Sequence, residues 1–227
     1  MNIKKDNYER RLKNMDEKIQ FGVLQWGPCV VRFKIPIDVH LLLLKEAKAS
    51  KEDASPVLAG VLNKEVRFRD KDKFKEFFEK SFTLYNHAFG SWKKSTTKLP
   101  KYHLSSLWCN FQRPNDFNPP HSHSGALSFV IYLQIPEELK DENEAYKGKS
   151  AGPGGITFLY GDGDSYAINN HSFFPEERDM FIFPAWVKHW VYPYQSDCTR
   201  ISVSGNIIDS MKLDQMEEAL RTGKNDK

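Results

Sequence analysis

The sequence has few cysteines and little excess charge, and each shortage excludes a class of protein. Three cysteines stand among 227 residues, no two of them close together. They provide neither the spacing of a zinc finger nor a framework of disulfides, and they favour a reducing compartment. The net charge of +3 is too close to balance to indicate nucleic-acid binding by itself.

Long hydrophobic runs are also missing. The longest apolar run, around Leu41–Leu44, is far shorter than the roughly 20 residues that a membrane-spanning helix needs. Residues 1–20 are rich in charged side chains and lack the apolar centre of a signal peptide. We therefore expect no membrane partner and a cytoplasmic location.

Short apolar segments separated by Pro, Gly, Asn and Asp follow one another from residue 104 onward, a pattern that predicts strands. The expected strands are residues 104–112, 125–135, 155–160, 165–169, 179–184, 189–194 and 198–207. Ahead of them, residues 30–35 alternate like a strand, Asp38 could cap a helix reaching Lys48, and residues 71–92 carry aromatic side chains at helical spacing. We expect loops at 50–66 and 137–154, the second of them mobile, and a short helix at 209–220.

Helices followed by many short strands, without a linker or a repeat, indicate one domain covering residues 1–227. Residues 1–103 would form a supporting region of helices and a strand, 104–208 the barrel core, and 209–227 a C-terminal helix and tail. The predicted fold class is mainly β with α: a β-barrel or sandwich buttressed by N-terminal helices.

Two histidines one residue apart occur in the segment PPHSHSG, directly before the apolar run at 126–133. At the start of a strand, His121 and His123 would project from the same face. His189 could join them from a distant strand. Imidazoles suit iron, zinc, copper and nickel, so the pattern predicts a metal site with three protein ligands and open positions. A lone histidine would more often be structural, and it is the combination that favours a metal.

Arg200 follows His189 by eleven residues, and Ser202 shares its phase of a strand. If 189–194 and 198–205 form a hairpin, Arg200 lies close to His189 across the ladder. The guanidinium and the hydroxyl could then hold the distal carboxylate of a dicarboxylic co-substrate. Alternation alone leaves open whether this polar phase faces solvent or the interior of a barrel.

Four segments, NPPHSHSGALSFVIYLQIP, GGITFLYGD, MFIFPAWVKHWVYPYQSD and RISVSGNI, resemble the 2-oxoglutarate/Fe(II)-dependent oxygenases common in bacteria and their tailed phages. The earlier SPVLAGVLNKE is similar to a segment that those proteins carry before the barrel. The resemblance, from about residue 55 to 208, implies a double-stranded β-helix, a jelly-roll or cupin-like barrel with iron at one open end and 2-oxoglutarate beside it.

Carried over by position, the resemblance implies that His121 and His189 bind iron. His123 stands where the wider superfamily usually has Asp or Glu, which raises the chance of another metal. Either Asp162 or Asp164 could supply a carboxylate instead, although GDGD is first of all a turn sequence.

For the co-substrate, the resemblance implies that Arg200 binds the far carboxylate of 2-oxoglutarate with help from Ser202. Tyr132 and Asn110 lie on strands that could face the same pocket, and each is a candidate second contact.

The function predicted is therefore a 2-oxoglutarate- and Fe(II)-dependent dioxygenase that oxidises, most simply by hydroxylation, an unidentified substrate and releases succinate and CO₂. The catalytic set would be His121, His123, His189 and Arg200. One alternative is a three-histidine cupin dioxygenase that does not use 2-oxoglutarate, and another is a non-catalytic barrel that binds a partner. The substrate could be a protein side chain, a nucleotide or a metabolite. If the gene belongs to a phage, the location would be the cytoplasm of its bacterial host.

Overall fold

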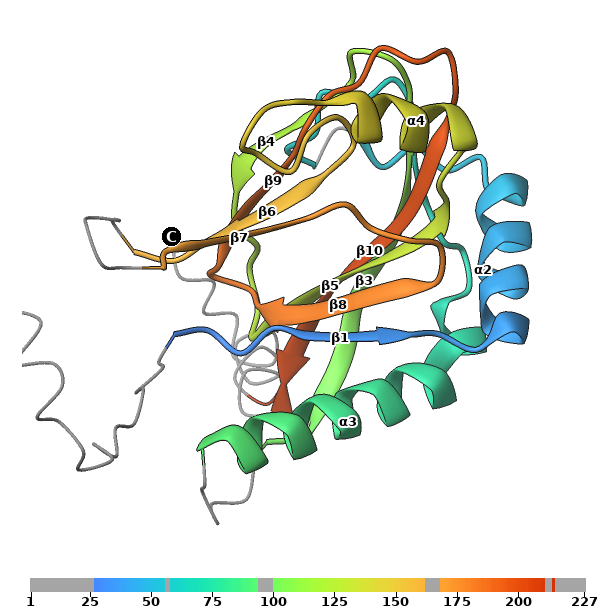
Figure 1. The fold of residues 1–227 in the computed structure, drawn as a ribbon. Coiled ribbons are helices and arrows are strands. Elements are labelled where there is room, and N and C mark those ends of the chain that lie inside the picture. Colours follow the sequence, from blue (N-terminus) through green and yellow to red (C-terminus); the bar gives the residue numbers. More distant parts are fainter. Residues whose placement is uncertain (1–26, 56–57, 94–99, 162–167, 211–213, 215–227) are drawn as a thin grey trace, which may run out of the picture.

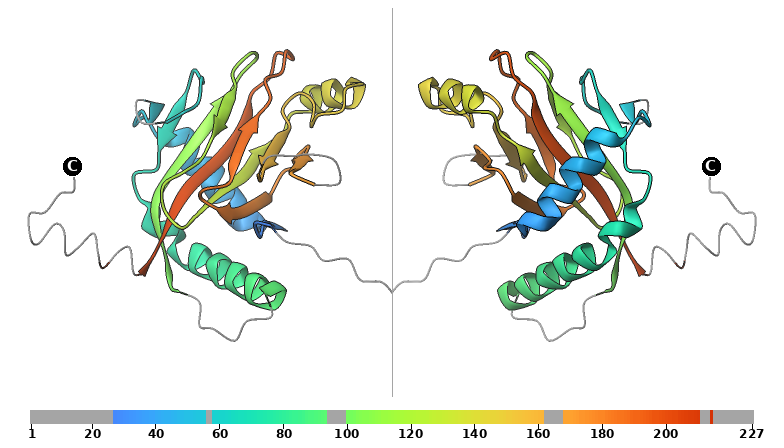
Figure 2. Two further views of the ribbon diagram at one scale, coloured as in Figure 1. Left: turned by 90° about the vertical axis from the view of Figure 1, so that its left-hand side faces the viewer. Right: turned by 90° about the vertical axis from the view of Figure 1, so that its right-hand side faces the viewer.

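Two antiparallel sheets face each other in the computed structural model, which describes residues 27–55, 58–93, 100–161, 168–210 and 214 (Figures 1 and 2). The larger sheet has the spatial order β1 (Val31–Lys34), β8 (Asp179–Pro184), β5 (Leu127–Gln134), β10 (Arg200–Asp209), β3 (Tyr102–Gln112) and β2 (Glu65–Arg67). The smaller sheet has the order β4 (Asn118–His121), β9 (Lys188–Val191), β6 (Ile156–Leu159) and β7 (Asn170–Phe173).

From β3 onward the chain passes back and forth between the two sheets. Strands β3, β5, β8 and β10 enter the larger sheet, while β4, β6, β7 and β9 enter the smaller one. This interleaving is the winding of a double-stranded β-helix, the double-sheet jelly roll. It confirms the fold class predicted from the sequence.

Two helices cover the outer face of the larger sheet (Figure 2). They are α2 (Ile37–Ala49) and α3 (Lys75–Lys93), and a 3₁₀ helix, η2 (Lys71–Phe74), leads into the second. Phe78 of α3 packs on Phe129 of β5 with their ring centroids 4.9 Å apart. Among the described residues, no helix is both long and apolar enough to cross a bilayer.

Alternation along β5 and β10 divides the core into two layers. Phe129 and Ile131 belong to the cluster under the helices, whereas Val130 and Tyr132 belong to the cluster between the sheets. Since successive side chains point to opposite faces, the phase of β10 that contains Arg200 faces the interior of the barrel. The question that alternation left open is thus answered.

The predicted hairpin between 189–194 and 198–205 is wrong. Strand β9 pairs with β4 and β6, and β10 pairs with β3 and β5, so the two lie in different sheets. The connecting segment crosses from one sheet to the other instead of turning back along the same ladder. Arg200 is the register partner of Gln112 on β3.

Three local predictions are also corrected. The expected mobile loop 137–154 begins with helix α4 (Glu137–Ala145). Asp38 lies in the first turn of α2, and Pro36 is its N-cap residue. Of the expected strand 165–169, residues 165–167 lie outside the described residues and 168–169 are not in a strand, and β7 (Asn170–Phe173) begins directly after them.

Within the expected loop 50–66, β2 begins at Glu65. Residues 1–26 lie outside the described residues, as does nearly all of the expected helix 209–220. The division of the chain at residues 103 and 208 stays a prediction.

Candidate metal and co-substrate site

Three imidazoles meet at one end of the space between the sheets. His121 ends β4 and is the register partner of His189 on β9. His123 follows in the turn, where its backbone N–H donates to the carbonyl of Ala185 at 2.8 Å. The pair therefore lies at the end of β4, not at the start of β5 as predicted. One ligand atom from each of the three rings lies within 4.8 Å of the others.

Backbone carbonyls orient two of these rings. His121 Nδ1 lies 2.6 Å from the carbonyl oxygen of Pro119, and His189 Nδ1 lies 3.0 Å from that of Val187. Because a carbonyl can only accept, each Nδ1 must carry the proton, which leaves a lone pair on Nε2. Metal-binding histidines are commonly oriented by such a second hydrogen bond.

The remaining nitrogens suit a shared cation. His123 Nε2 and His189 Nε2 are 3.2 Å apart, close to the roughly 3 Å between two nitrogens that bind one ion at right angles with bonds of about 2.1 Å. Burial, and then the neighbouring imidazoles, lower the pKa of His189 to about 3 and that of His123 to about 4. Burial also lowers the pKa of His121. Neutral imidazoles at pH 7 are the form that binds a metal, so the donor set fits Fe(II).

Arg200 enters the same space from the larger sheet. Its side chain is 2 % exposed, and its Nη1 donates to the carbonyl of Gly154 at 2.8 Å. Nε has no hydrogen-bond partner among the described residues, and no carboxylate in that part of the chain pairs with the guanidinium. Burial lowers the pKa of Arg200, but a guanidinium stays charged in proteins. A buried, unpaired cation of this kind calls for an anionic ligand.

Ser202, Asn110 and Tyr132 form a row across the larger sheet beside Arg200. Ser202 is the register partner of Asn110 on β3 and of Tyr132 on β5. The Tyr132 hydroxyl and Asn110 Oδ1 are buried without partners in the described residues. Arg200 lies over the Tyr132 ring, 5.3 Å from its centroid. Burial raises the pKa of Tyr132 to about 12, so the hydroxyl keeps its proton and can donate to a carboxylate.

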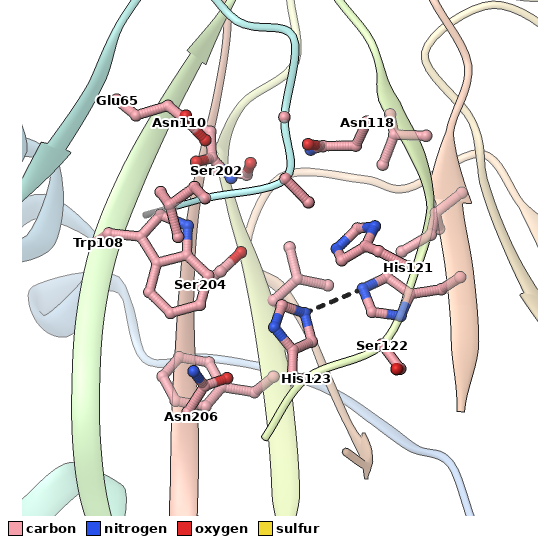
Figure 3. A pocket seen from close by; sticks show the side chains of 18 of the residues that line it. Glu65, Trp108, Asn110, Asn118, His121, Ser122, His123, Ser202, Ser204 and Asn206 are labelled. Carbon is pink, nitrogen blue, oxygen red and sulfur yellow. Dashed lines mark hydrogen bonds between the residues drawn. The ribbon is translucent and has the colours of Figure 1, made fainter. Parts of the chain in front are cut away.

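A single pocket of about 220 Å³ joins these groups (Figure 3). The three histidines, Arg200, Ser202 and Asn110 all line it. The structure therefore brings together six of the seven residues predicted from the sequence, and Tyr132 lies directly behind them, fully buried. Asp162 and Asp164 lie outside the described residues.

Sequence reasoning missed one ionisable residue of the pocket wall, Glu65. It ends the quoted segment SPVLAGVLNKE, which the family resemblance included without assigning it a role. A single Glu in a three-residue strand carries no pattern that would separate it from a surface residue.

Comparisons with known proteins identify one matching family and several similar folds. Residues 106–206 match the sequence model of a family described as "Putative 2OG-Fe(II) oxygenase". No curated protein matches the sequence.

Among solved structures, the chain is similar to a prolyl hydroxylase from Trichoplax adhaerens in complex with a hypoxia-inducible-factor peptide fragment. That similarity has a TM-score of 0.51 and 10% identity and covers 95% of this chain and 97% of the other. It is also similar to a prolyl-4-hydroxylase from Pseudomonas putida (TM-score 0.49, 13% identity, 79% of this chain and 92% of that chain). A third is the viral collagen prolyl hydroxylase of Paramecium bursaria Chlorella virus-1 in complex with 2OG (TM-score 0.48, 13% identity, 78% and 94%).

The fold is that of the double-stranded β-helix class. Residues 106–206 match the sequence model of the 2-oxoglutarate/Fe(II) oxygenase family, which confirms the resemblance found in the sequence. The protein is accordingly a dioxygenase whose cofactor is Fe(II) and whose co-substrate is 2-oxoglutarate.

Proposed function

We propose that His121, His123 and His189 hold the Fe(II) of this oxygenase. Arg200 and Ser202 would bind the distal carboxylate of 2-oxoglutarate, and Tyr132 and Asn110 would supply further hydrogen bonds. The observation that carries the proposal is the buried Arg200 guanidinium, which lines the same pocket as the three imidazoles and lacks a carboxylate partner among the described residues.

The protein residues bind and orient. When bound, the iron supplies the oxidative chemistry, in which 2-oxoglutarate is decarboxylated to succinate and CO₂ and the substrate is oxidised. The guanidinium offers a planar pair of N–H donors that matches a carboxylate. The Tyr132 hydroxyl, which stays protonated, can donate to the same group. Burial of Arg200, Tyr132 and Ser202 keeps water away and strengthens each of these hydrogen bonds.

A third imidazole replaces the carboxylate usual in the wider superfamily, which leaves the metal site one unit more positive. The nearby carboxylate of a bound 2-oxoglutarate would offset that charge. The ligand atoms of the three rings lie within 4.8 Å of one another, which supports His123 as the third ligand in preference to an aspartate of the GDGD segment.

Succinate formation tests the proposal. Anaerobically purified protein is given Fe(II), 2-oxoglutarate and air, and succinate is measured for the wild type, for Arg200→Ala and for the matched control Arg113→Ala, which removes an exposed arginine. We expect slow uncoupled succinate release in the wild type and the control. In Arg200→Ala, the apparent KM for 2-oxoglutarate should rise about 100-fold, the usual cost of truncating one partner of a buried charge pair.

The outcomes separate the rival functions. Normal turnover of Arg200→Ala at low 2-oxoglutarate would contradict the assignment of Arg200. Metal-dependent O₂ uptake without succinate would favour a three-histidine dioxygenase, and absence of both O₂ uptake and 2-oxoglutarate binding would favour a binding module.

We also propose a cytoplasmic location, in a bacterial host if the gene is phage-borne. Support comes from Cys29, Cys109 and Cys198, all of which carry free thiols, as is usual in reducing compartments. Fractionation of expressing cells tests this, and recovery from the periplasm would contradict it.

A further inference from the structure

Glu65 is a buried carboxyl on the wall of the pocket. Its strand, β2, pairs with β3 so that Glu65 is the register partner of Asn110. The row Tyr132, Ser202, Asn110 thus continues to Glu65 across four neighbouring strands. Glu65 is 2 % exposed, although an isolated glutamate is almost never so deeply buried.

Among the described residues, no positive side chain compensates this carboxyl. Oε2 of Glu65 has no hydrogen-bond partner in the described segments, and no lysine or arginine there forms an ion pair with it. The adjacent Lys64 lies over the ring of Phe111 instead, 4.3 Å from its centroid. The charged groups that act on Glu65 are Asp53 and Asp116, both acidic.

Burial and these two carboxylates raise the pKa of Glu65 to about 7. A negative local field with an unpaired acceptor attracts a cation, since bringing one close would relieve the desolvation and the repulsion together.

The neighbouring groups add acceptors and space. Oδ1 of Asn110 is also buried without a partner among the residues described. A Cβ at Gly60 would lie 3.1 Å from Oε1 of Glu65 and 2.5 Å from Oδ1 of Asn118. The glycine therefore keeps open the space beside Glu65, which a side chain would fill.

Figure 3 shows Glu65 and Asn110 beside each other at one end of the pocket, with His121 and His123 toward the other. A substrate could thus reach both ends at once. Glu65 lies outside the family match of residues 106–206, although it ends the segment SPVLAGVLNKE, which is part of the resemblance described above.

We propose that Glu65, assisted by Asn110, binds a positively charged nitrogen of the substrate, and that this oxygenase acts on an amine- or guanidine-bearing compound such as a basic amino-acid side chain. The cationic end pairs with Glu65, and a carbon several bonds away lies at the metal end of the pocket. This inference rests on the proposed function for the identity of the reaction, but not for the presence of the cation subsite.

A pair of probes tests the subsite. Butylguanidinium carries the charge, and N-butylurea has nearly the same shape without it. Binding of each is measured by calorimetry to oxygen-free protein loaded with Mn(II) and 2-oxoglutarate, and again to metal-free protein. We expect the wild type to prefer butylguanidinium by about tenfold or more, the usual value of a hydrogen bond to a charged group.

Two variants decide the role of Glu65. Glu65→Gln keeps the shape and should bring butylguanidinium down to the affinity of N-butylurea, whereas Glu52→Gln, which makes the same change at an exposed position, should keep the preference. A purely structural role predicts instead that Glu65→Gln lowers the melting temperature and leaves the preference intact. Equal binding of the two probes to the wild type, or no binding of either, would overturn the proposal.

Arg200→Ala separates this inference from the proposed function. The variant should bind 2-oxoglutarate about 100-fold more weakly and still prefer butylguanidinium. If the wild type binds no 2-oxoglutarate but keeps the preference, the assignment of the co-substrate site fails and the cation subsite stands.

Discussion

Individual buried polar groups without partners mark the pocket more clearly than any motif does. Five of the eight such side-chain atoms in the described part of the chain belong to Glu65, Asn110, Gln112, Tyr132 and Arg200. Each costs on the order of 1–3 kcal/mol when left unsatisfied. Their concentration on one face of four adjacent strands indicates that stability is given up there for ligand binding.

Glu65 should impose its own pH dependence on stability. Its pKa rises from 4.5 to about 7 on folding, so between these values the folded state holds a proton that the unfolded state has lost. The contribution of the protonated Glu65 to the free energy of unfolding is therefore fully present below pH 4.5 and is lost as pH rises through 7. The total, from 1.36 kcal/mol per pKa unit, is on the order of 3 kcal/mol.

Glu65→Gln removes that titration. We expect the variant to lose less free energy of unfolding than the wild type between pH 5 and 8 and to be the more stable of the two at pH 8. Urea unfolding at several pH values measures this, with Glu52→Gln as the control. Parallel curves for Glu65→Gln and the wild type would contradict the raised pKa.

Among individual residues, the sequence predicted the candidate metal ligands but missed the carboxyl of Glu65. His121, His123 and Arg200 were recognisable because their spacing and neighbours form a pattern. Glu65 owes its burial to the pairing of β2 with β3, which lies far along the chain, and to the segment around Gly60, which has no pattern that would indicate the contact.

Among the elements, helix α4 positions the turn that precedes Arg200. The carboxylate of Glu142 accepts the backbone N–H of Gln195 at 2.9 Å and that of Ser196 at 2.8 Å. In the same segment, the hydroxyl of Tyr194 accepts the backbone N–H of Arg200 at 3.2 Å. A helix in the connection between β5 and β6 thus stabilises the start of the strand that carries the guanidinium.

Glu142→Ala should weaken this turn. Burial raises the pKa of Glu142, but the hydrogen bonds from Ser196 and Gln195 outweigh it and lower the pKa overall. The contribution to stability is therefore present above the unfolded pKa of 4.5 and is lost as pH falls through the folded value. Because the side chain is half-exposed, we expect a loss of about 1 kcal/mol at pH 7.

Thermal unfolding at pH 7 and in acid measures the effect, and Glu144→Ala on an exposed position of the same helix is the matched control. A deficit in Glu142→Ala that persists unchanged below the folded pKa would show that the charge of Glu142 is not its source.

The elements that could be predicted are those with a clear period. Strand β8 occupies the predicted residues 179–184 because its side chains alternate between two apolar layers. Helix α4 was missed because Leu139 is its single buried residue, which leaves no apolar stripe to recognise. The false hairpin between 189–194 and 198–205 has another cause, since local periodicity does not say to which sheet a strand belongs.

For the whole molecule, the two sheets contribute different halves of the site. The smaller sheet and the turn after β4 supply the three imidazoles, and the larger sheet supplies Arg200 and Ser202. A metal with 2-oxoglutarate attached would therefore connect the two layers of the barrel. A ligand that binds the folded state stabilises it by mass action, so both ligands should raise the melting temperature.

We expect Mn(II) to raise the melting temperature by about 5–10 °C at about 100 times its dissociation constant, from roughly 2.7 kcal/mol of linkage and 2–4 °C per kcal/mol for a chain of this size. Adding 2-oxoglutarate should raise it further. Arg200→Ala should keep the rise in melting temperature caused by Mn(II), because the metal ligands lie on the other sheet, and should lose the further rise caused by 2-oxoglutarate. His189→Ala should lose both, whereas His171→Ala, an exposed histidine of the same sheet, should keep both. If 2-oxoglutarate stabilised His189→Ala as strongly as the wild type, the co-substrate would not depend on the metal, and the connection between the two sheets would be refuted.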